Sequence, residues 1–466
     1  MKSIAEAFAY IDSFTNLEMG ITPEKKRLYR LDRMRNLLAL FNNPQNSFKS
    51  IHIAGTKGKG STAALLANVL TAAGKKTGLF MSPHVSSPLE RISVPGWPLN
   101  ENLFTETVND IKEKIDTIRE NEEANVLFGL SAPTTFELLV LTAFLYFQKY
   151  ECGYAVIETG IGGRLDATNI IQPDACIITP IDLEHTDILG TTIEEIAAEK
   201  AGIIKKGVPI FCGFQPPAVE KVIRRISLIK ETQAFFLKEE VEFIKVFTAI
   251  DGTEFSVRLK RIGNGGNSAV RQFCLSLTGD FQAENAALVF LTLKSVYQWI
   301  TDQAFARGFR NTFLPGRFEI TGKDKNIVLD AAHTPLSVER LMQTYLKLFP
   351  EKGILIFGSV KGKNHTKMAE ILAPHFRRII ISRPGTFKES SPEEVYSSFK
   401  SLFKDTELII DPGKALAHAL RTAEVIRQNE GITVPILVTG SFYMVAPVRL
   451  LIQLKEQQQN TNRQKE

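Results

Sequence analysis

The stretch Ala54-Gly-Thr-Lys-Gly-Lys-Gly-Ser-Thr62 decides how the N-terminal part of this chain folds. It follows the short apolar segment Ile51–Ala54 and precedes Thr62–Ala73, a run of helix-forming residues that Gly74 closes. Glycines let a backbone turn sharply and aim its N–H groups at a phosphate, and Lys59 can reach the terminal phosphates of a nucleotide. Strand, glycine-rich loop and helix in this order predict a phosphate-binding loop for a nucleoside triphosphate.

The spacing inside this loop differs from the usual phosphate-loop pattern. Gly60 lies between Lys59 and Ser61, whereas the general motif places the Ser or Thr hydroxyl directly after the lysine. A flexible turn rich in glycine and lysine is the alternative interpretation. Because the flanking strand and helix lie where the mechanism requires them, phosphate binding is favoured, and the hydroxyl of Ser61 or Thr62 is available to Mg²⁺.

The composition argues against several classes of protein. The chain has 466 residues, of which 44% are apolar and 23% charged, as in ordinary globular proteins of about two or three domains. A net charge of +5 without a block of Lys and Arg argues against nucleic acid as a partner. The cysteines form no CxxC pair, and the longest apolar stretch, Leu138–Phe147, is too short to span a bilayer. We expect a cytoplasmic monomer that binds small molecules and neither nucleic acid nor a membrane.

The first part of the chain alternates predicted strands with predicted helices. The helices are the charged amphipathic segment 101–120 and the more apolar segment Thr135–Tyr150. This alternation predicts a parallel sheet that is covered by helices on both faces. The strands that follow the phosphate loop are Lys76–Met81, Tyr154–Glu158, Ala175–Thr179 and Val208–Cys212.

The pattern changes twice in the remainder of the chain. From about 233 to 278, β-rich segments with the glycine-rich turn Ile262–Gly266 predict a small antiparallel patch, and a helix returns over Gly279–Tyr297. Gly308 and Pro315-Gly316 indicate a boundary, after which strands and helices alternate again. The strands predicted there are Asn326–Asp330, Gly353–Phe357, Arg378–Ser382, Glu407–Asp411 and Pro435–Thr439.

The predicted fold class is therefore α/β, with two domains. A P-loop domain with a parallel sheet and the antiparallel patch is expected over residues 1–308, followed by a linker over 309–316. A smaller, Rossmann-like α/β domain is expected over 317–455. The tail 456–466, rich in Gln, Asn and Lys, is expected to be frayed.

Two polar residues follow predicted strands of the first domain. Glu158 stands at the end of an apolar strand, and His185 lies just past the next one, among acids. Ligands bind at the carboxyl ends of strands in open α/β sheets, so both side chains are candidate metal ligands. The alternatives are an N-cap or turn acid for Glu158 and a structural or surface role for His185.

Two further candidates come from less specific patterns. Lys200 lies in the helical segment Glu194–Gly202, where composition alone favours a solvated lysine. His333 follows a predicted strand of the second domain, within Asp330–Pro335. Strand ends lined by Asp, His and Arg in two domains suggest a substrate cleft between them.

Taken together, these motifs resemble the folylpolyglutamate synthase/dihydrofolate synthase branch of the Mur ligase family. The segment Glu158–Asn169 is the most specific of them, and the matching stretches occur in family order along most of the chain. They are Gly55–Thr62, Ser82–His84, Glu90-Arg91, Glu158–Asn169, His185–Gly190, Glu199–Ile203, Leu314–Phe318, Asp330–His333 and Gly440-Ser441.

The resemblance implies an ATP-dependent amide ligase with Mg²⁺ as its metal. ATP would phosphorylate a carboxylate of dihydropteroate or a folate, and the amine of L-glutamate would attack the acyl phosphate. Lys59, a carbamylated Lys200 and His333 would serve catalysis, and Ser82, Glu158 and His185 would be Mg²⁺ ligands. ATP would contact Thr56, Lys57, Gly58, Lys59, Gly60, Ser61, Asn285, Arg317 and Asp330, while Thr134, Thr135, Phe136, Glu137, Leu165, Asp166 and Ala167 would line the pteroate pocket.

Three departures from the family pattern bear on substrate preference. Lys57 stands where the family usually has Asn, Ser86–Pro88 replaces a basic-aromatic pair, and Thr334 replaces an Asn. None of them removes a proposed metal ligand or the phosphate lysine. A Mur-type ligase with a different carboxylate acceptor and a non-catalytic nucleotide-binding protein of the same fold are the alternative functions.

Overall fold

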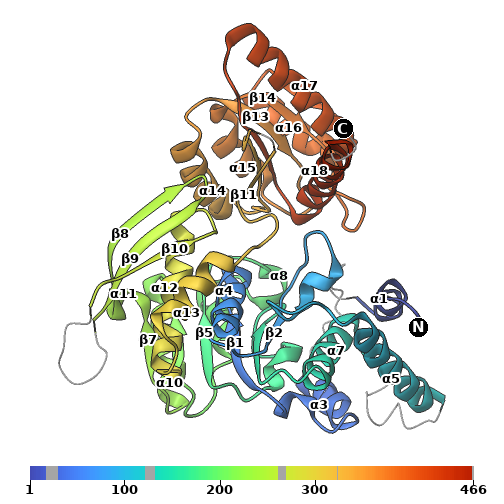
Figure 1. Ribbon diagram of the computed structural model, residues 1–466, viewed down its shortest axis with the longest axis vertical. Helices are drawn as coiled ribbons and strands as arrows, with labels where there is room; N and C mark the ends of the chain where they lie inside the picture. The colour runs from blue at the N-terminus through green and yellow to red at the C-terminus, as the bar shows by residue number, and fades with distance from the viewer. Residues whose placement is uncertain (17–29, 121–131, 261–268, 323, 464–466) are drawn as a thin grey trace.

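The computed structural model describes residues 1–16, 30–120, 132–260, 269–322 and 324–463. Two α/β bodies lie one above the other along the long axis of the molecule, and the chain passes from the lower to the upper one after α13 (Figure 1). The lower body holds the phosphate-loop sequence. Of the described helices, none is both long and apolar enough to cross a membrane.

The lower body is built on a seven-stranded sheet in the order β3-β2-β4-β1-β5-β6-β7. Its central strand β1 (Lys49–Ala54) pairs in parallel with β4 (Tyr154–Glu158) and β5 (Ala175–Ile178), so the ends of these strands meet at one edge. Only β3 runs antiparallel, at the edge beside β2. The other strands are β2 (Thr77–Phe80), β3 (Ile92–Ser93), β6 (Ile210–Cys212) and β7 (Ala234–Phe236).

Helices cover both faces of this sheet, which explains why its strands are apolar on both sides. On one face, α4 (Lys59–Ala72), α12 (Asp280–Val296) and α13 (Asp302–Asn311) share a core with β1. The other face carries two core clusters. Its helices are α1 (Ile4–Asp12), α3 (Leu31–Ala39), α5 (Glu101–Glu120), α7 (Thr135–Lys149), α8 (Thr186–Leu189), α9 (Ile193–Ala201) and α10 (Pro217–Ile229).

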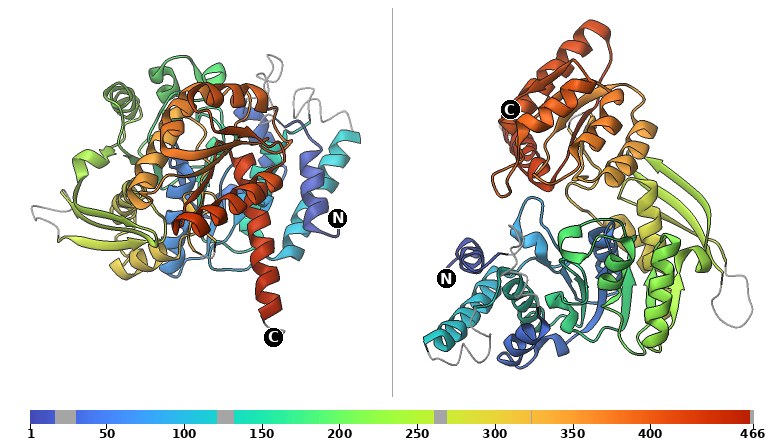
Figure 2. Two further views of the ribbon diagram at one scale, coloured as in Figure 1. Left: turned by 90° about the horizontal axis from the view of Figure 1, so that it is seen from above. Right: turned by 180° about the vertical axis from the view of Figure 1, so that it is seen from behind.

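A three-stranded antiparallel sheet, in the order β10-β9-β8, stands beside the lower body and reaches toward the upper one (Figure 2). It comprises β8 (Val241–Ala249), β9 (Gly252–Leu259) and β10 (Arg271–Leu275), and α11 (Leu237–Glu240) precedes it. Apolar side chains of β9 and β10 join the core formed with α12 and α13. The antiparallel patch is thus confirmed, while the predicted turn Ile262–Gly266 lies outside the described residues.

The upper body is a six-stranded sheet in the order β11-β12-β16-β13-β14-β15, parallel except for β11. Its strands are β11 (Glu319–Thr321), β12 (Ile327–Leu329), β13 (Gly353–Phe357), β14 (Phe376–Ile381), β15 (Thr406–Leu408) and β16 (Ile436–Thr439). One face packs on α14 (Pro335–Leu348), α15 (His365–Leu372) and α16 (Pro392–Leu402), the other on α17 (Pro412–Glu430) and α18 (Phe442–Arg463). The predicted α/β fold class is confirmed. Short 3₁₀ helices span Pro44–Asn46, Pro88–Arg91, Ala167–Ile170 and Ala373–His375.

Two predicted boundaries differ from the structure. Gly308 lies inside α13 rather than at the start of a linker, because a Cβ there would lie 2.5 Å from Val69 Cα, so the glycine permits close packing on α4. The frayed tail expected over 456–466 is helical as far as Arg463, because Gln, Lys and Glu are good helix formers. Residues 464–466 lie outside the described part.

Candidate active site

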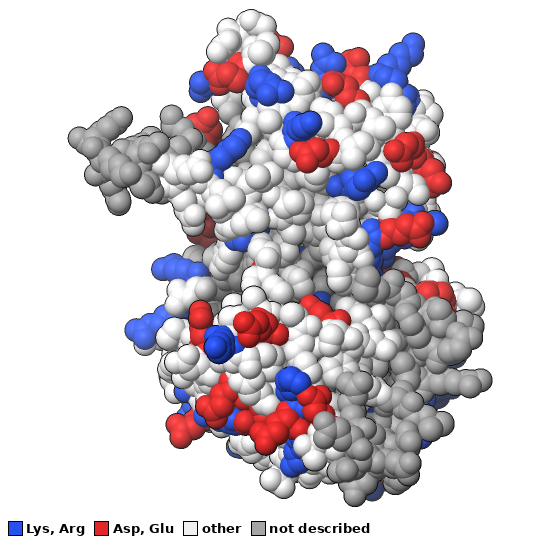
Figure 3. Space-filling view, turned by 90° about the vertical axis from the view of Figure 1, so that its right-hand side faces the viewer, with Lys and Arg blue, Asp and Glu red and all other residues white. Residues whose placement is uncertain are grey.

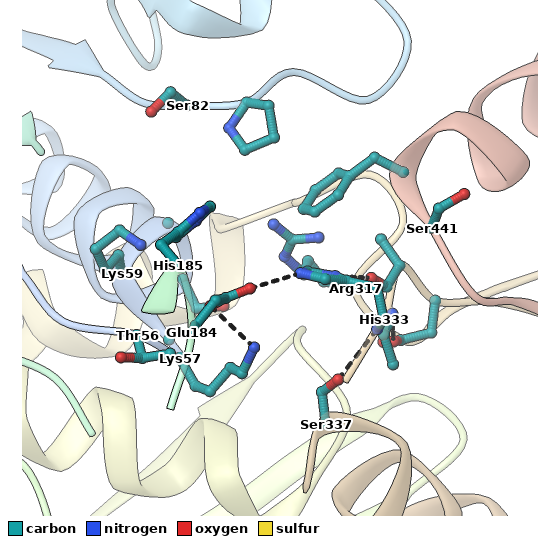
Figure 4. A pocket seen from close by; sticks show the side chains of 18 of the residues that line it. Thr56, Lys57, Lys59, Ser82, Glu184, His185, Arg317, His333, Ser337 and Ser441 are labelled. Carbon is teal, nitrogen blue, oxygen red and sulfur yellow. Dashed lines mark hydrogen bonds and ion pairs between the residues drawn. The ribbon is translucent and has the colours of Figure 1, made fainter. Parts of the chain in front are cut away.

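A cavity of about 410 Å³ lies where the strand ends of the lower sheet face loops of the upper body (Figure 4). The molecule narrows between its two bodies, and on the face shown in Figure 3 basic and acidic side chains are intermingled rather than gathered into one patch. Many of the predicted site residues line this cavity: Thr56, Lys57, Gly58, Lys59, Gly60, Ser61, Ser82, Glu158, His185, Asn285, Arg317, Asp330 and His333.

The phosphate loop has the backbone geometry that its glycines predict. Gly58 has a φ of +85°, and a Cβ there would lie 2.6 Å from the amide oxygen of Asn285, so this side chain lies directly over the loop. The helix α4 then begins at Lys59, with its N-terminus at the cavity. The backbone N–H groups of Thr56 and Lys57 both donate to Pro180 O, which fixes the loop against the segment after β5.

Glu158 ends β4 and is buried. Its Oε2 accepts a hydrogen bond from Ser82 N at 3.2 Å, and its Oε1 lies 3.8 Å from Lys59 Nζ. Burial raises the pKa of this carboxyl, although the nearby charge of Lys59 acts in the opposite direction. The carboxylate is therefore only partly compensated by protein groups.

His185 caps the start of α8 in a left-handed backbone conformation, with a φ of +55°. Burial lowers the pKa of its imidazole to about 4, so the ring is neutral near pH 7 and can offer a nitrogen lone pair. Within the described ranges, no three His, Cys, Asp or Glu side chains converge as a metal site. The proposed ligand set Ser82, Glu158 and His185 thus stays a prediction.

Lys200 is buried, contrary to the solvated lysine that composition favours. Its Nζ donates to Gly55 O at 2.6 Å, so α9 carries the amine to the base of the phosphate loop. Burial lowers the pKa of this amine to about 7, and the positive charge of Lys59 acts in the same direction. A substantial neutral fraction near pH 7 follows.

Among the lining residues that sequence reasoning missed is Glu184, directly before His185. Its Oε2 lies 3.2 Å from Lys57 Nζ, and its Oε1 lies 3.0 Å from His333 Nε2. Burial disfavours ionisation of Glu184, but the His333 hydrogen bond and the charge of Lys57 outweigh it and hold the pKa of this carboxyl well below its usual value. The signal that could have found it is its place at the same strand end as His185.

Arg317 and Asp330 come from the upper body. The oxygens of Asp330 accept hydrogen bonds from Phe318 N and Ala332 N, both at 2.8 Å, and burial raises the pKa of this carboxyl. The guanidinium of Arg317 lies over the ring of Phe442, 4.4 Å from its centroid. The upper body also brings to the cavity basic side chains for which no motif gave a signal: Arg340, Lys363 and Lys388.

The residues predicted to line a pteroate pocket lie outside the lining of this cavity. Thr134 and Glu137 cap α7 reciprocally, and Glu137 also pairs with the buried Arg33 at 3.1 Å. The ring of Phe136 packs on Gly160, where a Cβ would lie 2.6 Å from it. Asp166 accepts hydrogen bonds from the N–H groups of Gly160 and Ile161. The remaining members of the set, also outside the lining, are Thr135, Leu165 and Ala167.

Two family models match the chain, one for each of its two bodies. The Mur ligase middle domain matches residues 53–293, and the Mur ligase glutamate ligase domain matches residues 316–442. A dihydrofolate synthase/folylpolyglutamate synthase of Bacillus subtilis is 31% identical over 444 residues, which cover 93% of this chain and 96% of that protein.

Solved structures match nearly the whole chain. A Mycobacterium tuberculosis folylpolyglutamate synthase complexed with ADP superposes with a TM-score of 0.85 at 28% identity, covering 96% of this chain and 98% of that one. An FPGS–AMPPCP–folate complex superposes with a TM-score of 0.77 at 28% identity, over 96% of this chain and 98% of that one.

Proposed function

The chain belongs to the Mur ligase family, in its folylpolyglutamate synthase/dihydrofolate synthase branch of ATP-dependent ligases, and from this premise we propose that it adds L-glutamate to dihydropteroate, to folates, or to both. The reaction passes through an acyl phosphate. The observation that carries the proposal is a single cavity lined by the phosphate loop from one body and by basic residues from the other.

The phosphate end of the cavity suits transfer of the terminal phosphoryl group of ATP. Lys59 stands at the N-terminus of α4, where its charge and the helix field both favour anions. Asn285 lies over Gly58 and Arg317 lines the same cavity, which supports the proposal that both contact the nucleotide. Positioning and charge neutralisation are the main requirements of phosphoryl transfer.

The residues around Glu158 fit Mg²⁺. This cation is usually bound by one or two carboxylates together with substrate phosphates, rather than by a complete set of protein ligands. Glu158 offers a buried and only partly compensated carboxylate, and Ser82 and His185 line the same cavity. We assign these three residues to the metal, which would neutralise charge on the phosphoryl group when bound.

Lys200 is proposed to be carbamylated. Carbamylation requires a neutral amine, and the buried environment that lowers the pKa of Lys200 supplies one. The modified side chain would be an anionic oxygen ligand at the base of the phosphate loop, close to Gly55. Mass spectrometry of the intact protein under native conditions should detect the added CO₂, and Lys200→Arg should lack it.

The end of the cavity formed by the upper body is suited to anionic substrates. Arg340, Lys363 and Lys388 all line it, and L-glutamate carries carboxylates that such cations bind. His333 and Lys363 both contact Glu184, and we propose that His333 acts near the incoming glutamate or the acyl phosphate. A cleft between two bodies also protects an acyl phosphate from water when it closes.

The direct test is turnover by the purified full-length protein. With ATP, Mg²⁺ and L-glutamate, it should release phosphate and form a glutamylated product from dihydropteroate or from tetrahydrofolate. Absence of phosphate release with both acceptors contradicts the proposal, and an acceptor screen then distinguishes another Mur-type ligase. Turnover that survives Lys59→Ala would contradict the assigned site.

The finer expectations about organisation are proposals as well. We propose a monomer located in the cytoplasm, with its domains divided after α13, in the later part of the predicted linker 309–316. Light scattering on the eluate of a size-exclusion column measures the oligomeric state, and the mass of a dimer would contradict the proposed monomer.

A further inference from the structure

Glu184 joins the two bodies of the molecule through one carboxylate. From the lower body, Lys57 Nζ lies 3.2 Å from Oε2. From the upper body, His333 Nε2 lies 3.0 Å and Lys363 Nζ 3.6 Å from Oε1. We propose that Glu184 is a positioning residue that holds His333 and the phosphate loop in register for the glutamylation step. This inference rests on the proposed function.

The ring of His333 is held at both of its nitrogens. Nδ1 lies 2.8 Å from Ala331 O, in its own loop, and Nε2 lies 3.0 Å from Glu184 Oε1, in the other body. Rotation of the ring would lose both contacts. The direction in which His333 faces the cavity is therefore set by a residue 149 positions away in the sequence (Figure 4).

Lys57 gives the same carboxylate a second attachment. Its backbone N–H donates to Pro180 O, while its side chain reaches Glu184 in the loop that follows Pro180. The phosphate loop and the loop after β5 are thus tied at two points. A shift of the upper body is transmitted through His333 and Glu184 to the phosphate loop, because each member of the chain contacts the next.

The contacts lie where an ion pair is strong. The side chain of Glu184 is 11% exposed and that of Lys57 15% exposed, so solvent screens the pair only weakly. A single carboxylate faces two lysines and a histidine. Its removal leaves basic groups without their shared partner, and basic groups of the two bodies then repel one another.

Glu184 acts through its neighbours, which separates it from residues that contact phosphate. Replacement by Gln keeps the shape and removes the charge. We expect Glu184→Gln to lower kcat for glutamate ligation by about 10²-fold, the size of effect that a misplacement of about 1 Å produces. Affinity for the ATP analogue AMPPCP should fall by a smaller factor than kcat, because Lys57 loses its partner while Lys59 and Glu158 remain intact. Glu184→Asp should recover part of kcat.

The matched control is Glu194→Gln, which neutralises an exposed glutamate on α9, the second helix after Glu184 in the chain. Melting followed by circular dichroism verifies that each variant folds, and Glu184→Asp replaces Glu184→Gln if the latter does not. A kcat for the Glu184 variant within about twofold of the control would overturn the proposal.

A second measurement does not depend on turnover. In protein labelled with ¹⁵N-histidine, the ring signals of His333, assigned with His333→Gln, should move in Glu184→Gln and stay in place in Glu194→Gln. Unchanged His333 signals overturn the proposal whatever the activity. If the wild-type protein ligates no glutamate, the proposed function fails, and the NMR measurement alone decides whether Glu184 holds His333.

Discussion

Two glutamates follow the strands on either side of β1, and their surroundings differ. Glu158, after β4, lies 3.8 Å from Lys59 and accepts one backbone hydrogen bond. Glu184, in the loop after β5, faces His333 at 3.0 Å and two lysines. Burial raises the pKa of Glu158, whereas the partners of Glu184 hold its pKa well below the usual value.

The difference fits the two roles that we propose, a metal ligand for Glu158 and a positioning residue for Glu184. Glu158 has less compensating charge within the protein than burial demands, and a bound divalent cation would supply the missing charge. Glu184 is already satisfied by groups of both bodies, so it has no need of a ligand. Residue type and burial alone would have assigned the two carboxylates the same role.

The largest expected effect concerns turnover. We expect Glu158→Gln to lower kcat by about 10³-fold, since it removes a proposed ligand of the Mg²⁺ ion that would neutralise charge during phosphoryl transfer. Glu184→Gln should lose less, because it acts only on the placement of other groups. Steady-state phosphate release measures both variants, and the distinction between the two glutamates breaks down if Glu184→Gln is the more damaging.

The requirement for metal should distinguish the two residues next. A metal chelator should abolish turnover of the wild-type protein, and added Mg²⁺ should restore it. In Glu158→Gln the Mg²⁺ concentration for half-maximal rate should rise about 10- to 100-fold. A Mg²⁺ titration of Glu184→Gln serves as the comparison, and an equal rise in that variant would show that Glu184 too is a ligand.

In the absence of nucleotide and metal, the substitutions Glu158→Gln and Glu184→Gln should change the free energy of unfolding in opposite directions. The pKa of Glu158 is raised in the folded protein, so its ionised form at neutral pH disfavours folding, and Glu158→Gln should raise the free energy of unfolding. The pKa of Glu184 is lowered, so its contribution is present above the unfolded pKa and is lost as pH falls through the folded pKa.

At pH 7, Glu184→Gln should therefore lower the free energy of unfolding by about 1–3 kcal/mol, between the values for exposed and for buried ion pairs, because its partners are partly buried. Urea unfolding at pH 7 measures the sign of the change in the free energy of unfolding for each variant. In a second series at lower pH, the difference in this free energy between wild type and Glu184→Gln should become smaller. Shifts of the same sign in the two variants would remove the physical basis of the comparison.

The smallest effect on stability is expected for Lys363, at the edge of the cluster formed by Glu184, Lys57, His333 and Lys363. Lys363 lies 3.6 Å from Glu184 and its side chain is 25% exposed, so it is more screened than Lys57. Lys363→Met should reduce the stability contribution of the cluster by about 1 kcal/mol or less, against a larger loss for Lys57→Met. Urea unfolding of the two variants side by side tests this order.

Local patterns predicted a large part of the fold. Strand Tyr154–Glu158, helix 101–120 and strand Gly353–Phe357 are found with the predicted bounds. Apolar periodicity and glycine placement report short-range structure, which explains this agreement. The domain boundary predicted at Gly308 differs from the structure because local patterns do not report helix packing. In sequence, a glycine that allows two helices to approach looks like one that ends a domain.

For the site, the sequence by itself determined the phosphate loop and the candidate ligands Glu158 and His185, because the loop follows β1, Glu158 ends β4 and His185 lies in the loop after β5. Only the tertiary structure decided that Lys200 is buried beneath Gly55, and that Glu184 contacts His333 across the cavity. These pairs are separated by 145 and 149 residues. No local pattern encodes such a contact, because it depends on how helices pack on a sheet and on how the two bodies face each other.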